Sequence, residues 1–276
     1  MKKSLNAWSV PGGVSFAEMF RQLAAAGFEG VELNLEQDNA SLHSLTMETT
    51  AAELKEIRLL AEASGLAVAG ISTGLCGRFP LGSPEPSVRE KGKDVIRRQL
   101  ELAQSLGADG VLTAPGGHGT EVSLKRAHEN VTAALSELAG EVRASGILLG
   151  VENVWNGFFL SPFDMARLID DVACPSVGAY FDAGNVAVYS DPVHWAEILG
   201  RRIKKVHVKD FQRGGRVHSG EFVNLLEGGI RWAPLMRELR AAGYDGFLTA
   251  ELGVIGQCPE FLYEITARAL ERILAM

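Results

Sequence analysis

Hydrophobic and polar positions alternate regularly along the chain. Short apolar runs rich in Val, Ile and Leu are separated by amphipathic segments of about 10 to 20 residues, which is typical of parallel strands covered by helices. Strands are expected at residues 4–9, 30–34, 67–72, 110–114, 147–152, 177–182, 203–208 and 246–251. Helices are expected near residues 15–27, 47–65, 86–107, 121–145, 162–171, 192–200, 231–243 and 259–275.

Glycine marks the ends of several predicted helices. Gly27, Gly65, Gly107 and Gly243 each follow a helical pattern and precede a short apolar run. Glycine is favoured at such positions because helices often end on a residue in the left-handed conformation. The recurring order of helix, glycine and strand indicates one βα unit used repeatedly. Eight units of about 34 residues fill the 276 residues without a linker.

Two α/β folds agree with this pattern. A (β/α)8 TIM barrel needs roughly 250 residues, which the chain provides. An open, doubly wound sheet is the alternative, and it normally has a G-x-G-x-x-G turn after its first strand. Here the first strand leads into residues 10–13 (VPGG), and the glycine-rich residues 116–119 follow the fourth strand. We therefore predict an α/β fold with a single TIM barrel domain over residues 1–276.

Composition and charge narrow the classes of function. Hydrophobic residues make up 46% of the chain and charged residues 22%, as in a soluble protein with a large core. A net charge of −7 argues against a nucleic-acid partner. Without a signal-like start or an apolar run of membrane-spanning length, we expect a cytoplasmic protein with no membrane partner. Three separated cysteines favour neither a disulfide framework nor a thiolate zinc site.

Polar residues end or interrupt four consecutive predicted strands at the face where barrels place their active sites. They are Glu152, Asp182, His207 and Glu251. Neighbouring strands lie about 4.8 Å apart, so these side chains can converge. Three adjacent carboxylates would repel one another without a cation. The sequence therefore predicts one divalent metal ion, for which the oxygen-rich ligands suit Mn²⁺, Mg²⁺ or Co²⁺, with Zn²⁺ as an alternative.

The stretches around these residues resemble a known family. GVENVW, YFDAGN, VHVKDF, FVNLLEGGIRW and YDGFLTAEL resemble the xylose-isomerase-like TIM barrels, specifically the sugar phosphate isomerase/epimerase group. That group includes D-tagatose 3-epimerase, L-ribulose-5-phosphate 3-epimerase and hydroxypyruvate isomerase. The resemblance is close over the last four strands and extends to the first half in layout, with GVELNLE and ISTGL.

The resemblance implies an enzyme. It would be a divalent-metal-dependent isomerase or epimerase that converts a ketose, keto acid or sugar phosphate through a cis-enediolate. A small-molecule sugar or sugar phosphate is then its partner, and a homodimer or homotetramer is compatible with the group. The implied metal ligands are Glu152, Asp182, His207 and Glu251, and the two glutamates are also the implied catalytic acid/base pair.

Substrate-binding roles follow from the same resemblance. Arg213, six residues after the metal histidine, corresponds to an arginine that binds substrate oxygen. Asn185 stands where the group often has a histidine that touches substrate. Phe158 stands where some ketohexose epimerases have a glutamate. The last two departures point away from a free ketohexose as substrate.

Further residues near this face are candidates for binding. Glu32 ends the second strand and is expected to contact substrate. His118 is either a pocket residue or a solvated loop histidine. Trp155 either stacks on a sugar or fills the barrel mouth. Arg216 shares a loop with Arg213, and barrels often bind phosphate with the loops after strands seven and eight, which slightly favours phosphorylated substrates.

Two roles are possible for Lys209 and Asp210, two residues that follow the predicted metal histidine. They orient the ligands, or they form an ordinary salt bridge.

Three other functions share part of this pattern. A dehydratase of the inosose or 3-dehydroshikimate type would use the same metal and enolate but expel a β-hydroxyl group, producing a new absorbance. A phosphodiesterase of the endonuclease IV type needs more histidines at strand ends than the sequence offers. A non-enzymatic carbohydrate-binding barrel would exchange no solvent deuterium into a bound sugar.

Overall fold

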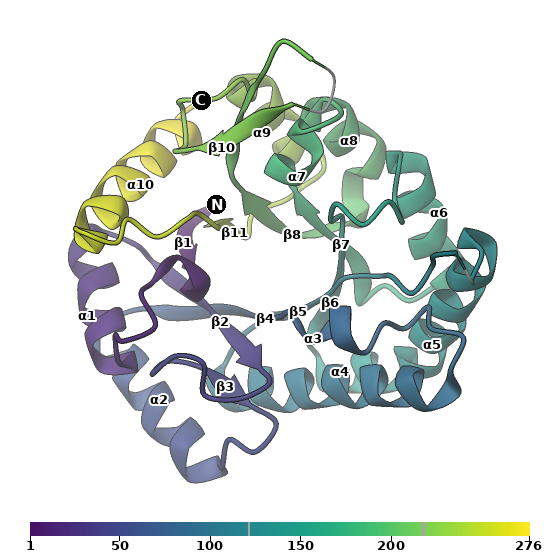
Figure 1. Cartoon of the computed structure of the whole chain (residues 1–276). Helices are drawn as coiled ribbons and strands as arrows, with labels where there is room; N and C mark the ends of the chain where they lie inside the picture. Colours follow the sequence, from purple (N-terminus) through teal and green to yellow (C-terminus); the bar gives the residue numbers. More distant parts are fainter. Residues whose placement is uncertain (121, 217–218) are drawn as a thin grey trace.

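A closed ring of eight parallel strands forms the centre of the molecule, and helices surround it (Figure 1). The computed structural model describes residues 1–120, 122–216 and 219–276. The ring strands are β1 (Lys2–Asn6), β2 (Gly30–Glu36), β4 (Ala67–Thr73), β5 (Gly110–Thr113), β6 (Leu148–Glu152), β7 (Val177–Asp182), β8 (Ile203–Val208) and β11 (Phe247–Ala250). Strand β1 pairs with both β2 and β11, which closes the ring. The predicted TIM barrel is confirmed, and the open sheet is excluded.

Each predicted helix is present. The helices are α1 (Phe16–Ala26), α2 (Ala51–Ala63), α4 (Pro86–Leu106), α5 (Leu124–Ser145), α6 (Pro162–Val172), α8 (Pro192–Leu199), α9 (Trp232–Ala241) and α10 (Pro259–Leu274). The predicted start of the fourth helix, residue 121, lies outside the described residues. Gly27, Gly65, Gly107 and Gly243 all have the left-handed conformation expected of them. Of the helices in the described ranges, none has the length and apolar character needed to cross a bilayer.

Two predicted boundaries were wrong because side chains cap the neighbouring helices. The first strand ends at Asn6, whose side chain accepts a hydrogen bond from the backbone N of Trp8 and starts the 3-10 helix η1 (Ala7–Ser9). Helix α2 begins at residue 51 instead of 47, because Thr50 and Glu53 form a reciprocal capping box. Short elements that were not predicted are β3 (Leu45–Thr46), α3 (Leu75–Arg78), α7 (Ala183–Ala187) and η2 (Gly200–Arg202).

A β-hairpin follows β8 at the rim of the barrel, where a phosphate-binding loop was expected. It consists of β9 (Asp210–Arg213) and β10 (Gly220–Val223), which pair antiparallel (Figure 1). The buried Asp210 carboxylate accepts hydrogen bonds from the backbone N of Leu226 and Ile230 and from Trp232 Nε1. A Cβ atom on Gly228 would lie 2.1 Å from Asp210 Oδ1. One carboxylate therefore fixes the base of the hairpin and the segment after it.

Candidate metal centre

Four potential metal ligands meet at the carboxyl end of the barrel. Glu152 and Asp182 end β6 and β7, His207 is the penultimate residue of β8, and Glu251 directly follows β11. Strand register places Asp182 beside His207. One ligand atom of each residue lies within 4.8 Å of those of the other three. The structure thus brings together the four residues predicted as a metal set.

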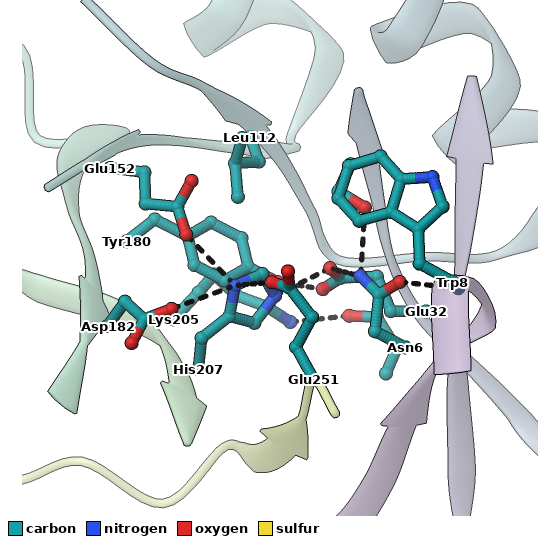
Figure 2. A network of polar contacts seen from close by, with 12 residues as sticks. Asn6, Trp8, Glu32, Leu112, Glu152, Tyr180, Asp182, Lys205, His207 and Glu251 are labelled. Atoms are coloured by element: carbon teal, nitrogen blue, oxygen red, sulfur yellow. Dashed lines mark hydrogen bonds and ion pairs between the residues drawn. The ribbon is translucent and has the colours of Figure 1, made fainter. Parts of the chain in front are cut away.

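The His207 ring is oriented by carboxylates on both sides, as Figure 2 shows. Its Nε2 lies 2.7 Å from Glu32 Oε1. Its Nδ1 lies 3.1 Å from Glu152 Oε1 and 3.3 Å from Glu251 Oε2. A carboxylate that holds the remote nitrogen is the usual arrangement for a metal-ligating histidine. Nδ1 is therefore the nitrogen available to a cation.

Carboxylate charge is concentrated around His207. Burial is the largest cause that raises the pKa of Glu152, to about 7, and the charges of Asp182 and Glu251 add to it against the opposing effect of His207. Burial alone would lower the pKa of His207, but Glu32 and Glu152 raise it well above its usual value. The carboxylates around His207 therefore favour its protonated form in the metal-free cluster. A divalent cation would replace that proton.

Asp182 provides a direct test of whether a cation fits. Its Oδ1 accepts a hydrogen bond from the backbone N of Asn185 at 2.8 Å. Within the described part of the chain, its Oδ2 is a fully buried oxygen that makes no hydrogen bond. Lys209 Nζ lies 3.2 Å from Oδ2 as an ion pair without hydrogen-bonding geometry. A buried, unpartnered carboxylate oxygen among three other donors fits a divalent metal ion.

A cavity of about 590 Å³ opens directly onto this cluster. Its lining includes Glu152, Glu251, Asn185 and Lys209. Residues where β4 and β5 end also line it, namely Thr73, Gly74, Cys76, Gly77 and residues 114–117. A molecule bound in the cavity therefore has both glutamates, an amide and an ammonium group within its reach.

Glu32 lies behind the cluster and not at the cavity wall, which corrects the expected contact with substrate. Its side chain is fully buried. Oε1 accepts a hydrogen bond from Asn6 Nδ2 at 2.8 Å as well as contacting His207, and Oε2 accepts one from Tyr180. Burial alone would raise the pKa of Glu32, but His207, Tyr180 and Lys205 lower it. Glu32 is thus an ionised group that holds the metal histidine (Figure 2).

The other residues predicted to bind substrate differ in whether they line the cavity. Asn185 lines the cavity, with its Nδ2 donating to the backbone O of Asn153 at 3.1 Å. Trp155 is 58% exposed and stacks on Phe222 of the hairpin, with ring centroids 4.8 Å apart. His118 is half-buried beside Phe158 and outside the cavity wall. The roles predicted for Trp155 and His118 stay predictions.

The two arginines of the hairpin do not line the cavity. Arg213 Nε donates to the backbone O of Ala187 at 2.9 Å, and its Nη2 donates to the backbone O of Ser190. Arg213 therefore lines a separate hollow beside α8. Arg216 is exposed between β9 and β10. Substrate binding by either arginine stays a prediction.

Lys209 and Asp210 have separate partners. Lys209 Nζ contacts Glu251 Oε1 at 3.0 Å in addition to Asp182, whereas Asp210 holds the hairpin base. Burial alone would lower the pKa of Lys209, but the charges of Asp182 and Glu251 raise it. The salt bridges of Lys209 are therefore made to two predicted metal ligands, whereas Asp210 contacts the segment after the hairpin.

The contact between Glu32 and His207 leads to a prediction. Glu32→Gln removes the charge that holds Nε2 but preserves the shape of the side chain, so Mn²⁺ affinity should fall by about 10- to 100-fold. Titration calorimetry with Mn²⁺ measures this. Glu29→Gln changes an exposed carboxylate three residues away and should leave the affinity unchanged. Equal affinity in Glu32→Gln and the unmodified protein would refute the positioning role.

Comparison with known proteins gives consistent matches. The model of a family described as "Xylose isomerase-like TIM barrel" matches residues 20–272. A provisionally named L-ribulose-5-phosphate 3-epimerase, SgbU of Escherichia coli (strain K12), is 24% identical over 242 residues, 87% of this chain and 84% of that protein. The L-ribulose-5-phosphate 3-epimerase UlaE of Salmonella typhi is 24% identical over 245 residues, 86% and 82% of the two chains. A crystal structure of D-psicose 3-epimerase with D-fructose matches with a TM-score of 0.78, 18% identity and full coverage of both chains.

Proposed function

The chain belongs to the xylose isomerase-like TIM barrel family, and on this premise we propose that it is a divalent-metal-dependent epimerase or isomerase of a ketose, keto acid or sugar phosphate. One observation carries the proposal: Glu152 and Glu251 belong to one ligand cluster and also line one cavity. The names of the curated relatives, which are sugar-phosphate epimerases, support the same class of enzyme.

The metal ion would be held by Glu152, Asp182, His207 Nδ1 and Glu251. Three carboxylates and one imidazole suit Mn²⁺, Mg²⁺ or Co²⁺, and Zn²⁺ also accepts such ligands. When bound, the ion supplies electrostatic stabilisation for the negative charge that develops on the substrate oxygens. Glu32 keeps His207 in the required orientation throughout.

The two glutamates would move the proton. They come from strands that are separated in the ring by β7 and β8, so they approach the cavity from different sides. One carboxylate removes the proton from the carbon next to the substrate carbonyl, which leaves a cis-enediolate. The other returns a proton to the opposite face of that carbon, and the configuration inverts. Return to the neighbouring carbon would give an isomer instead.

A panel of ketoses, keto acids and their phosphates in deuterated water tests this function. The protein is stripped of metal and reloaded with Mn²⁺, and products are followed by NMR. We expect turnover that depends on the metal, with deuterium at the reacting carbon. A new enone absorbance would identify a dehydratase instead. Absence of exchange into every compound would contradict an enzymatic role on these substrates.

The phosphate preference is tested at the hairpin. If a phosphate group reaches Arg216, Arg216→Ala should lower kcat/KM for the best phosphorylated substrate by about tenfold, because a charge-assisted hydrogen bond is lost. The unphosphorylated sugar should be unaffected. Arg167→Ala removes an exposed arginine from α6 and serves as the control. An unchanged kcat/KM in Arg216→Ala would remove Arg216 from the substrate site.

A further inference from the structure

Lys209 places a fixed positive charge inside the ligand cluster. Its Nζ lies 3.2 Å from Asp182 Oδ2 and 3.0 Å from Glu251 Oε1. The side chain is 14% exposed, and that exposure is toward the cavity that it lines. The ammonium group therefore contacts two of the predicted ligands and belongs to a residue of the cavity wall.

The backbone of helix α7 lies against the first carbons of the Lys209 side chain. A Cβ atom on Gly184 would lie 2.5 Å from Lys209 Cβ and 2.8 Å from Cγ. This close approach restricts where the side chain starts. At its other end, Nζ is shared by three groups, because it contacts Asp182 and Glu251 and lies 6.0 Å from the centre of the Phe222 ring.

A metal ion and the ammonium group require the same oxygens. Asp182 Oδ2 makes no hydrogen bond but pairs with Lys209, and Glu251, the second partner of Lys209, is another predicted ligand. Two cations that share carboxylates repel each other strongly at such distances, above all in a poorly solvated site. Lys209 should therefore weaken the binding of a divalent ion, although it lies beside the ligands.

We propose that Lys209 holds Asp182 and Glu251 only in the metal-free protein, and that in the loaded enzyme its ammonium group turns to the cavity and donates to a substrate oxygen next to the reacting carbon. The second role rests on the proposed function. Negative charge develops on such an oxygen as the proton leaves, so a positioned ammonium group stabilises it. Lys209 would thus be a substrate-binding residue that lowers metal affinity.

Two substitutions test the proposal. Loss of the positive charge should raise the affinity for Mn²⁺ but lower kcat/KM. Lys209→Met keeps the stem and removes the charge. Its Mn²⁺ affinity, measured by calorimetry without substrate, should rise by about tenfold or more. Its kcat/KM should fall by about 10- to 100-fold, as expected for the loss of a hydrogen bond to a charged group. Lys209→Arg keeps the charge, so it should bind Mn²⁺ more weakly than Lys209→Met does. It should also keep much of the activity of the unmodified protein.

The outcomes separate this role from simpler ones. If Lys209 only held the ligands in place, Lys209→Met would bind Mn²⁺ more weakly, and this result would overturn the proposal. Unchanged kcat/KM with tighter metal binding would overturn the substrate contact. Lys204→Met, at a lysine of β8 that lies beside Gly178, should change neither quantity. Lys209→Gln replaces Lys209→Met if circular dichroism shows misfolding.

The metal measurement is independent of the proposed reaction. If the unmodified protein converts no sugar, the proposed function fails, yet the sign of the change in Mn²⁺ affinity still decides whether Lys209 opposes the metal ion.

Discussion

Replacing either Glu152 or Glu251 with glutamine should lower turnover by about 10² or more, the usual scale of general acid–base catalysis. Glutamine keeps an oxygen that can bind the metal ion but cannot carry the transferred proton. Alanine would be less informative, because it also removes a ligand from the cluster. Metal analysis of both glutamine variants should show an occupied site, so that the loss can be assigned to proton transfer.

Deuterium exchange distinguishes the roles of the two glutamates. If they act on opposite faces of the substrate, one variant should still exchange the substrate proton with deuterated water although net conversion is blocked. The surviving carboxylate then removes and returns the proton on its own face. Glu221→Gln, at an exposed position in β10, is the control and should keep full turnover. Near-normal conversion by both variants would place the proton carriers elsewhere, with His118 the next candidate.

Asp182→Asn should abolish the stabilisation of the protein by metal. At a Mn²⁺ concentration of 100 times Kd, the free energy of unfolding of the unmodified protein should rise by about 2.7 kcal/mol. For a chain of this size, that corresponds to an increase in Tm of roughly 5 °C or more. His207→Ala should show no such increase and should retain no metal ion. Asp182→Asn should behave in the same way, because its Oδ1 stays bonded to the backbone N of Asn185 and an NH2 group replaces Oδ2, the oxygen left for the metal ion.

Without metal, Asp182→Asn should be at least as stable as the unmodified protein. This change removes one of three crowded charges, and asparagine Oδ1 can still accept the hydrogen bond from the backbone N of Asn185. Its Tm in the presence of a chelator should therefore equal or exceed that of the unmodified protein. Asp170→Asn, whose carboxylate pairs with Arg202 at the surface, should keep the full response to Mn²⁺. Full metal occupancy in Asp182→Asn and His207→Ala would refute the site.

The location of the four ligands could be predicted because it depends only on topology. Each lies at or near the end of an apolar run, and parallel strands in a barrel all end at one face. The same rule placed Glu32 at the end of a strand predicted at residues 30–34, but β2 continues to Glu36, so Glu32 lies within the strand and deeper than expected. Depth depends on neighbours such as Asn6, which pairs in register with Glu32, and Tyr180, which lies among apolar residues of β7. Asn6 was the available signal, because it interrupts an apolar strand beside Glu32.

The hairpin after β8 could not be predicted from local sequence. Its strands are four residues each, and the stretch between them contains glycine, arginine and serine, which equally suits an open loop. What fixes the hairpin is the Asp210 carboxylate, whose partners lie 16 to 22 residues further on. The spacing of Arg213 from His207 therefore did not determine where its side chain points.

Closure of the ring through β1 and β11 also sets an order of events during synthesis of the chain. Residues of β11 leave the ribosome long after the other seven strands, so β1 and β8 each keep an unpaired edge until then. Glu251 comes directly after β11, so the last strand to join the ring also brings the last metal ligand. A nascent chain that ends before residue 246 therefore has neither a closed barrel nor a complete ligand set.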